Sequence, residues 1–374
     1  MGKSVWASYP KTIVRCAIIE RNAFFALSCD RKAKLKTGEI AISDKELEAY
    51  SQIIKMADLV SPMSIRAGVT LGLFEQIKKS PGSAHAISQR VQVAPPKIRA
   101  LLNVLEPLGL IKCDKEGLYH LTTLGEFLTE DNGGISKIFD LDSALGQYEY
   151  SIIGLVDSLR EGRSYFASQF GKDYWQLVEG SAKDRSLVAS MSSDAAAFDA
   201  DQLVSDEVWK SVSSIIDVGG GNGNILIALA EKHNHLRGAV FDLPGRVESA
   251  RALIDKHGLQ SRLDVIGGSF FDQIPREFDC YLLNAILADW SDNQCATLLH
   301  KIRKAMGRQG LLLVSEVDPT VSLGDPSMHL KMICSTEGWI RTPQEVYKIL
   351  VKSGFELIKS SSSHDRFTHL YRPA

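Results

Sequence analysis

The sequence has no excess of charge of either sign. Its 43 lysines and arginines nearly balance its 45 aspartates and glutamates, which leaves a formal net charge of -2. Proteins that hold nucleic acid or an anionic membrane through their overall charge carry a surplus of cations. The composition therefore gives no global reason to expect either partner, and we expect the chain to bind a small molecule.

Closely spaced cysteines are also missing. The sequence contains no C-x-x-C pair, and its cysteines lie far apart, at Cys16, Cys29, Cys113, Cys280, Cys295 and Cys334. This spacing argues against a disulfide framework and against a zinc ribbon, and it suits reduced thiols in a cytoplasm. We expect a cytoplasmic protein without a bound metal.

A long uninterrupted apolar run is the third absence. The longest apolar stretch of the N-terminal arm is interrupted by Glu20, Arg21 and Asn22. The arm therefore has neither the core of a secretion signal nor the length of a membrane span. We expect no association with a membrane.

The content that is present indicates a globular protein of two domains. A length of 374 residues, with 44% hydrophobic and 24% charged residues, allows sizeable cores. We expect an N-terminal arm over residues 1–42, a mainly helical domain over 43–135 and an α/β domain over 136–374. Residues 136–205 of the last domain are expected to be mostly helical. Their aromatic residues either line a pocket or belong to ordinary core: Tyr148, Tyr150, Tyr165, Phe166, Phe170, Tyr174 and Trp175.

The mainly helical domain has the order of a winged helix. Helical periodicity and then a hairpin follow one another over residues 44–59, 65–77, 86–91, 95–108, 110–112 and 119–121. In a DNA-binding protein the helix at 95–108 would enter the major groove, but it offers only Lys97 and Arg99 as cations. Neutralising a phosphate backbone needs more. A packing or dimerisation module is therefore favoured.

The larger domain has the pattern of a doubly wound α/β fold. Short apolar runs alternate with helix-like segments, as in a parallel sheet, at residues 215–218, 239–243, 263–266, 280–283 and 311–314. Two late segments, 355–359 and 368–371, are expected to add an antiparallel pair at the edge of this sheet.

A glycine-rich turn follows the first of these runs, where residues 213–223 read SSIIDVGGGNG. Four glycines between residues 219 and 223 let the backbone approach a ligand where any Cβ would clash. Asp242 ends the next strand, where an acid can accept both hydroxyls of a ribose. Asn224 replaces the third glycine of the dinucleotide motif, and no Gly-Lys-Ser/Thr follows. The turn therefore predicts a nucleoside ligand without a pyrophosphate.

Five motifs in a fixed order carry a resemblance to a known family: the glycine turn, FDLP at 241–244, GSFF at 268–271, ADW at 288–290 and GWIRT at 338–342. Over residues 45–372 the chain resembles S-adenosylmethionine-dependent small-molecule O-methyltransferases. The segment MADLVSP at 56–62 is most similar to the bacterial branch that tailors aromatic polyketides and related natural products. The resemblance implies a winged-helix dimerisation domain, hence a homodimer, and a Rossmann-like methyltransferase domain. It also implies that S-adenosylmethionine is the cofactor and S-adenosylhomocysteine its product.

The resemblance implies a set of cofactor-binding residues: Asp217, Gly219, Gly221, Gly223, Asp242, Leu243, Ser269, Phe270 and Asn284. In this set the glycines would pass close to the methionine part of the cofactor, Asp217 would support the turn and Asp242 would hold the ribose hydroxyls. Ser269 stands where the family usually has an acid that meets the adenine amino group. A hydroxyl still bonds there, but less strongly than an ionised partner.

The chain departs from the family at the chemistry. The family reads Leu-His-Asp-Trp, with the histidine as general base, whereas residues 287–290 read Leu-Ala-Asp-Trp. Ala288 cannot accept a proton. One of the two glutamates that flank the base in the family is kept as Glu316, and the other is replaced by Ile340. Both the usual base and one of its orienting groups are therefore absent.

His329 is the candidate replacement, because it stands where the family commonly has an aspartate near the substrate. It either deprotonates or orients an acceptor hydroxyl, or it only packs. The expected catalytic residues are His329, Asp289 and Glu316, with Asp289 better suited to holding its loop than to acting as the base. The expected substrate pocket contains Tyr148, Tyr150, Met191, Ala288 and Met332.

Three functions follow from these observations. The resemblance implies methyl transfer to an aromatic or polyketide-like acceptor, in which orienting the reactants supplies about 7–11 kcal/mol in favourable cases. Without the histidine, O-, C- and N-methylation all stay open. The alternative is an enzyme that binds the cofactor without transferring its methyl group, such as a pericyclase, hydroxylase or decarboxylase. A winged-helix DNA-binding regulator is less favoured because the charge is near neutral.

Overall fold

A computed structural model describes residues 44–131, 134–188, 203, 207–321 and 325–374. The chain divides into two units, Met1–Asp58 and Leu59–Ala374. Helix α2 (Asp44–Met56) is the described part of the first unit. No described helix has both the length and the apolar character that crossing a membrane requires.

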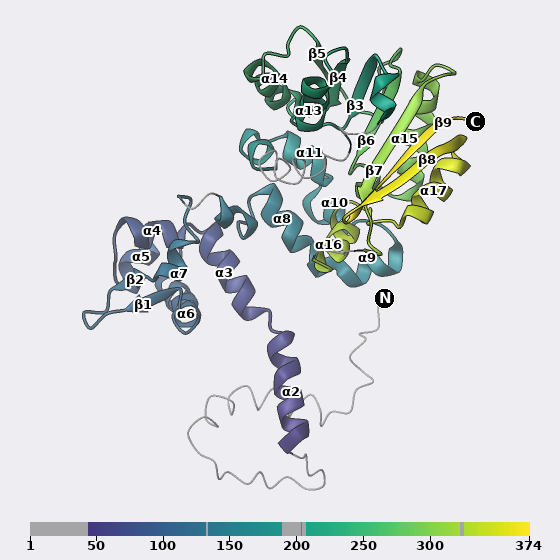
Figure 1. The fold of residues 1–374 in the computed structure, drawn as a ribbon. Helices are drawn as coiled ribbons and strands as arrows, with labels where there is room; N and C mark the ends of the chain where they lie inside the picture. The colour runs from purple at the N-terminus through teal and green to yellow at the C-terminus, as the bar shows by residue number, and fades with distance from the viewer. Residues whose placement is uncertain (1–43, 132–133, 189–202, 204–206, 322–324) are drawn as a thin grey trace. The chain divides into compact units, whose positions relative to one another are not determined.

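The second unit begins with a small helical module that contains a hairpin before its last helix (Figure 1). Its elements are α3 (Val60–Thr70), α4 (Leu73–Lys79), α5 (Ala84–Arg90), α6 (Pro95–Leu105), β1 (Ile111–Cys113), β2 (Tyr119–Leu121) and α7 (Thr123–Glu126). The helical periodicity predicted over residues 65–77 is divided between two helices, α3 and α4. Gly72 adopts a φ of 66° between α3 and α4, a left-handed conformation that ends one helix and starts another. Leu73, Phe74 and Leu102 then fill the module's core.

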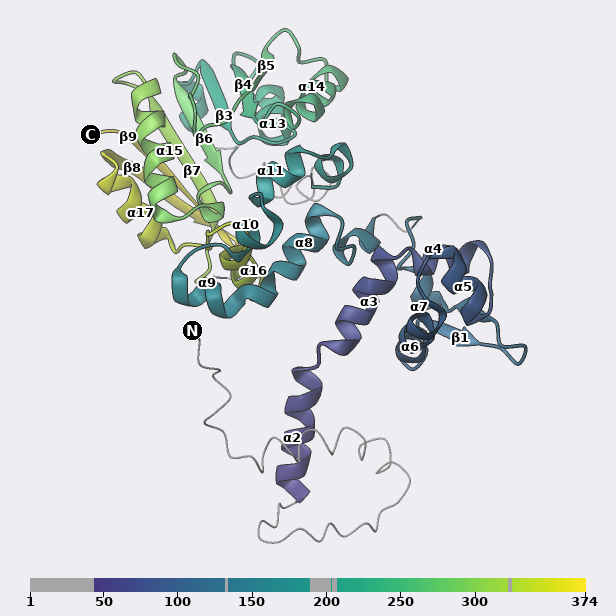
Figure 2. The ribbon, with the colours of Figure 1, turned by 180° about the vertical axis from the view of Figure 1, so that it is seen from behind.

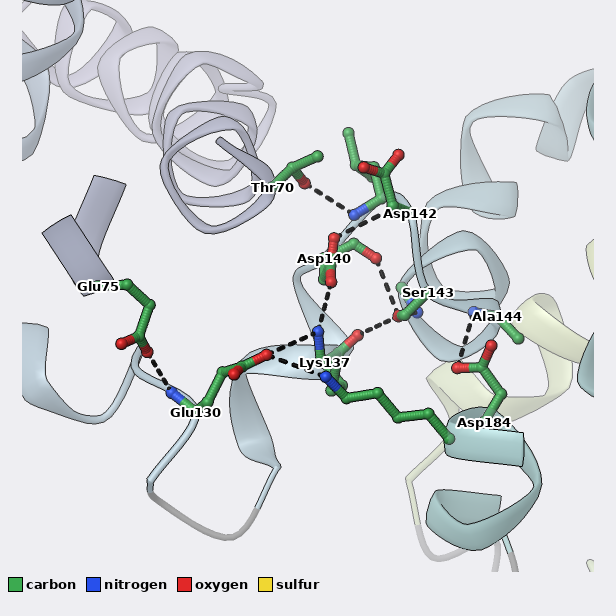
Figure 3. A network of polar contacts seen from close by, with 12 residues as sticks. Thr70, Glu75, Glu130, Lys137, Asp140, Asp142, Ser143, Ala144 and Asp184 are labelled. Atoms are coloured by element: carbon green, nitrogen blue, oxygen red, sulfur yellow. Dashed lines mark hydrogen bonds and ion pairs between the residues drawn. The ribbon is translucent and has the colours of Figure 1, made fainter. Parts of the chain in front are cut away.

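A polar segment joins this module to the rest of the second unit (Figure 3). The backbone N–H of Leu141 donates to the Thr70 hydroxyl over 2.9 Å. Lys137 pairs with Asp140 at 2.7 Å and with Glu130 at 3.5 Å. Because these contacts reach residues on both sides of the segment, they hold its backbone where it enters the next helices.

A layer of short helices follows. It comprises η2 (Ile135–Ile138), α8 (Ala144–Tyr150), η3 (Ser151–Gly154), α9 (Leu155–Glu161), α10 (Tyr165–Phe170) and α11 (Tyr174–Glu179). Most of the aromatic residues expected here share one cluster, in which the Tyr148 and Tyr174 rings lie 5.0 Å apart and the Phe166 and Phe170 rings 4.7 Å apart. Phe166 is fully buried. The cluster supplies the core of this layer.

The carboxyl-terminal part of the chain builds a seven-stranded sheet in the order β5-β4-β3-β6-β7-β9-β8. The strands are β3 (Ser214–Val218), β4 (Arg237–Asp242), β5 (Leu263–Gly267), β6 (Cys280–Asn284), β7 (Leu311–Val317), β8 (Phe355–Ser363) and β9 (Arg366–Pro373). Strands β3 to β7 pair in parallel, whereas β9 pairs antiparallel with β7 and β8. The predicted Rossmann-like fold with an antiparallel pair at one edge is confirmed.

Helices cover both faces of this sheet (Figures 1 and 2). Alternate residues of β3 serve the two faces: Ile215 packs in the core with α13 and α14, and Ile216 in the core with α15 and α17. These helices are α13 (Asn224–Lys232), α14 (Val247–Lys256), α15 (Asp292–Ala305) and α17 (Pro343–Lys352). Burial on both faces explains why the strands read as continuous apolar runs. Helix α16 (Ser327–Ser335) contacts α8 and α9 instead.

The first turn of α17 gives a stability prediction. The Thr342 hydroxyl accepts from the Glu345 N–H, and the Glu345 carboxylate accepts from the Thr342 N–H, which together form a capping box. We expect Thr342→Ala to lower the free energy of unfolding by about 1 kcal/mol, because the Glu345 N–H in the first turn of the helix loses its acceptor. Urea denaturation followed by circular dichroism measures this. Thr342→Ser is the matched control and should stay near wild type, and equal stability of all three proteins would contradict the prediction.

Candidate functional site

A cavity of about 770 Å³ opens at the carboxyl ends of the parallel strands. Ligands of open α/β sheets bind at this edge, where the strand order reverses. Here the reversal lies between β3 and β6. The cavity is lined by most of the residues expected to bind a cofactor: Asp217, Gly219, Gly221, Asp242, Leu243, Ser269, Phe270 and Asn284, together with Asp289.

The glycine turn forms the floor of the cavity at the end of β3. Gly219 has a φ of 76°, and its N–H donates to the carbonyl of Phe241 over 2.7 Å. A Cβ at this position would lie 2.4 Å from Cδ1 of Ile286. Gly223 is not among the residues that line the cavity. It precedes α13 with a φ of 79°, and a Cβ there would lie 2.9 Å from Val240. Both glycines are therefore required by contacts within the fold.

Asp242 stands at the end of β4 beside this turn and is 7% exposed. Its Oδ2 accepts from the Gly221 N–H at 2.8 Å and its Oδ1 from the Leu243 N–H at 2.7 Å. The Arg246 guanidinium lies 3.4 Å from Oδ2. Each carboxylate oxygen has two acceptor sites, so Asp242 keeps acceptor capacity for hydroxyls in the cavity.

Three carboxyl groups at the cavity have raised pKa values: Asp217 and Asp289 line it, and the buried Glu316 lies behind Ile286. Burial, and then the charge of Asp242, raises the pKa of Asp217 to about 7. Burial, and then the charge of Glu316, raises the pKa of Asp289 to about 7. Burial likewise raises the pKa of Glu316 to about 7, against the effect of hydrogen bonds from the backbone of Leu287 and Ile286. A cationic ligand would lower all three pKa values, because it favours the ionised acids.

Three aromatic rings, those of Phe270, Phe271 and Trp290, form a corner of the cavity wall. Phe270 and Trp290 meet edge to face with ring centroids 5.6 Å apart, and Phe271 packs 4.7 Å from Trp290. The Ser269 hydroxyl oxygen accepts from the Phe271 N–H over 3.2 Å. Its own hydrogen stays available to donate. The corner therefore offers flat apolar rings beside one polar group.

The buried side chain of Arg341 holds the loop at residues 287–290, where the family has its histidine. This side chain is 2% exposed and donates to the carbonyls of Leu287 and Trp290 over 2.6 and 2.8 Å, and to Asp292. Gly338 lies so close that a Cβ there would be 2.0 Å from the carbonyl oxygen of Ala288. Glu316 accepts from the first N–H groups of the same loop, so it fixes the backbone here and has no histidine to orient.

The expected substrate-side residues do not line the large cavity. His329 is half-buried on α16, and its Nε2 is buried without a hydrogen-bond partner. Tyr148 lies on α8 and donates to the sulfur of Met328 over 3.5 Å. Tyr150 and Ala288 are half-buried and Met332 is buried, while Met191 lies outside the described residues. The structure thus brings His329 and Tyr148 to neighbouring helices.

Arg246 was not named from the sequence, and Arg341 was given no role there beyond its place in the GWIRT motif. Trp175 was named only as one of seven aromatic residues. Arg246 and Trp175 both line the cavity, and the arginine lies over the indole at 5.2 Å. Asp242 ends β4 and Arg246 is the N-cap residue of α14, so no helical spacing in the sequence signals the pair between them. The role of Arg341 depends on packing between distant segments, and no local pattern reveals it.

Comparisons with known proteins agree with this architecture. The model of an O-methyltransferase domain matches residues 153–356, and that of an O-methyltransferase dimerisation domain matches residues 54–131. A 2,7-dihydroxy-5-methyl-1-naphthoate 7-O-methyltransferase of Streptomyces carzinostaticus is 31% identical over 307 residues, which cover 82% of this chain and 92% of the relative.

Two further similar proteins are a hydroxylase and an O-methyltransferase of known structure. The aclacinomycin 10-hydroxylase of Streptomyces purpurascens is 30% identical over 331 residues, which cover 86% of this chain and 87% of that one. The crystal structure of an O-methyltransferase from neocarzinostatin biosynthesis, with S-adenosyl-L-homocysteine and 1,4-dihydroxy-2-naphthoic acid, is similar with a TM-score of 0.71 and 27% identity. It covers 89% of this chain and is itself covered completely.

The buried Asp217 gives a prediction about pH. Its pKa is about 7 in the folded chain and 3.8 ordinarily, so its stabilising contribution is complete below about pH 4 and is lost as the pH rises to about 7. We expect Asp217→Asn, which cannot ionise, to flatten the fall of stability over this window by at most about 1.4 kcal/mol per pH unit. Urea denaturation of the ligand-free protein at pH 5, 6, 7 and 8 measures the slope.

Asp272→Asn is the control for this experiment, because Asp272 lines the same cavity but is exposed. It should keep the wild-type slope. Some slope should also remain in Asp217→Asn, since Asp289 and Glu316 have raised pKa values in the same range. A slope in Asp217→Asn equal to that of wild type would show that Asp217 is already ionised when buried.

Proposed function

The chain belongs to the S-adenosylmethionine-dependent O-methyltransferase family, and from this premise we propose that it methylates an aromatic or polyketide-like small molecule in natural-product biosynthesis. The observation that carries the proposal is the glycine turn beside Asp242, where backbone and carboxylate face one cavity and a Cβ at Gly219 would be strained by its positive φ and crowded by Ile286. The naphthoate methyltransferase among its relatives supports an aromatic acceptor.

The residues around the cavity fit the cofactor. Asp242 has acceptor capacity for ribose hydroxyls, the aromatic corner of Phe270 and Trp290 suits a flat base, and Ser269 has a hydrogen to donate. The acids Asp217 and Asp289 suit a ligand that carries positive charge. Once bound, the cofactor would supply an electrophilic methyl group for a nucleophilic acceptor.

The chain's own residues then have three tasks. Trp175 of α11 lines the cavity and packs on Tyr174, which contacts Tyr148, so these rings exclude water from this side of the cavity. Arg341 and Glu316 keep the loop at residues 287–290 in place. A proton from an O–H or N–H acceptor needs a receiver, and the buried, unpartnered Nε2 of His329 is our candidate for this role. Asp289, whose pKa is raised to about 7, is the second candidate.

One observation favours a different reaction with the same cofactor. Ala288 offers no proton acceptor where the family has its base, and a relative with 30% identity is named a hydroxylase. The mass difference between substrate and product separates the alternatives. A gain of one methyl group together with release of S-adenosylhomocysteine supports methyl transfer. A product without the methyl group, formed only while the cofactor is bound, supports the alternative.

We also propose that the chain acts as a homodimer in the cytoplasm and binds neither nucleic acid nor membrane. The match to an O-methyltransferase dimerisation domain supports the dimer. Several apolar side chains of α2 are exposed in the single chain, among them Ile53 at 58% and Ile54 at 52%, as expected for a surface that a second copy covers. Sedimentation equilibrium measures the stoichiometry.

Asp242 gives a prediction on cofactor binding. We expect Asp242→Asn to weaken the affinity for S-adenosylhomocysteine by roughly 10- to 100-fold, because hydrogen bonds to a charged acceptor contribute about 1.5–3 kcal/mol. Isothermal titration calorimetry measures the dissociation constant. Asp272→Asn, an exposed acid at the same cavity, should bind like wild type. If the two variants bind equally well, Asp242 does not hold the ribose.

His329 gives a prediction on turnover. We expect His329→Ala to lower kcat by about 100-fold or more if His329 accepts the proton, and to leave the dissociation constant of S-adenosylhomocysteine unchanged, because His329 does not line the cofactor cavity. Product formation as a function of pH and calorimetry measure the two quantities. His300→Ala, on the exposed face of α15, is the control. Wild-type turnover of His329→Ala would remove this residue from the reaction.

A further inference from the structure

We propose that Arg246 binds the α-carboxylate of the cofactor's methionine part, an inference that rests on the proposed function. The cofactor carries two positive groups, its sulfonium and its ammonium, and one negative group, its carboxylate. A site that holds all three needs acids for the first two and a cation with free donors for the third.

The charges around the cavity are mostly negative. The acids that line it are Asp173, Asp217, Asp242, Asp272 and Asp289, and within the described part of the chain the lining cations are Arg246 and Arg366. Arg366 is engaged elsewhere, since its Nη2 donates to Asn284 over 2.9 Å and to the carbonyl of Ser315 over 3.2 Å. An anionic group that entered the cavity would therefore be stabilised chiefly by Arg246.

Arg246 is held in place by two neighbours. Its Nε lies 3.4 Å from Asp242 Oδ2, and its guanidinium lies over the Trp175 ring at 5.2 Å from the centroid. The side chain is only 12% exposed. A planar guanidinium stacked on an aromatic ring loses little further freedom when it binds a carboxylate, so the group is already ordered for that task.

The guanidinium still lacks hydrogen-bond acceptors. A guanidinium has five N–H donors, and among the described residues none accepts a hydrogen bond from Arg246 within normal geometry. Its Nη1 is buried without a partner, as is the indole Nε1 of Trp175. Asp242 does not fill this need, because it lies at 3.4 Å and its oxygens already accept two backbone N–H groups. Buried donors without partners are costly, and a carboxylate with two oxygens would satisfy them.

The position of Arg246 relative to the glycine turn identifies which part of the cofactor it meets. Its Nη2 would lie 3.4 Å from a Cβ built on Gly221, whose N–H is bound to Asp242. With the ribose on Asp242 and the base on the rings around Phe270, the amino-acid part of the cofactor would be the part left to meet Arg246. Arg246 adjoins Gly221, whereas Phe270, whose ring suits the base, lies 3.6 Å from a Cβ built on Gly219.

A structural role for Arg246 predicts a different result. If the arginine only orients Asp242, its loss weakens every ligand that carries a ribose. If it binds the carboxylate, its loss weakens only ligands that have one. Two ligands separate these cases: S-adenosylhomocysteine, and its decarboxylated analogue, which keeps the adenosine, the thioether and the amine.

The experiment is isothermal titration calorimetry of the full chain with both ligands. For wild type we expect the analogue to bind about 10- to 100-fold more weakly than S-adenosylhomocysteine, the range for a charge-assisted hydrogen-bonded pair. For Arg246→Gln we expect S-adenosylhomocysteine to lose about that factor and the analogue to change less than about 3-fold, so the preference disappears. Arg251→Gln, an exposed arginine of the same helix, should keep the wild-type preference.

The outcomes are distinct. Equal weakening of both ligands in Arg246→Gln, or wild-type preference in that variant, overturns the assignment of the carboxylate while leaving the proposed function intact. Failure of folded wild-type protein to bind either ligand instead overturns the proposed function itself. The wild-type comparison of the two ligands needs no variant, so it tests the carboxylate's contribution even if Arg246→Gln does not fold. Absence of any wild-type preference contradicts the inference.

Discussion

The site depends on one close approach of backbone at the carboxyl edge of the sheet. Gly219 bonds to the end of β4 through Phe241, and the side chain of Ile286, which follows β6, fills the space where a Cβ would be. Three strand ends therefore meet within van der Waals contact of a single residue without a side chain. This contact sets the position of the turn, which sets Gly221 against Asp242, and the cavity opens from there.

The acidic residues at the same cavity favour a ligand that carries positive charge. Asp217, Asp289 and Glu316 all have pKa values raised by burial, which means that the fold keeps acids where water does not solvate their charge. Such an arrangement costs stability at neutral pH, and a cation in the cavity would recover part of that cost. The same acids explain why a buried arginine can be tolerated beside them. Charge balance within the cavity thus links stability to ligand binding.

Much of this was predictable from local patterns, and the rest was not. The apolar runs gave the parallel strands, and the acid after the second run gave Asp242 at the edge of the sheet, because parallel strands share their carboxyl ends. The break between α3 and α4 at Gly72 was not located, because the helical periodicity continues through it. Arg246 was missed because its importance arises from Trp175, a residue of a distant helix. Periodicity describes one segment at a time, whereas such contacts are set by the packed fold.

Arg341 and Gly338 have a consequence for how this enzyme's chemistry can vary. The loop at residues 287–290 is held through its backbone: Arg341 donates to its carbonyl oxygens, Glu316 accepts from its N–H groups and Gly338 packs against it. The side chain of Ala288 makes none of these contacts. The side chain at residue 288 can therefore be replaced without loss of the contacts that fix the loop's backbone. A histidine at residue 288 would therefore leave every hydrogen bond that holds this loop in place.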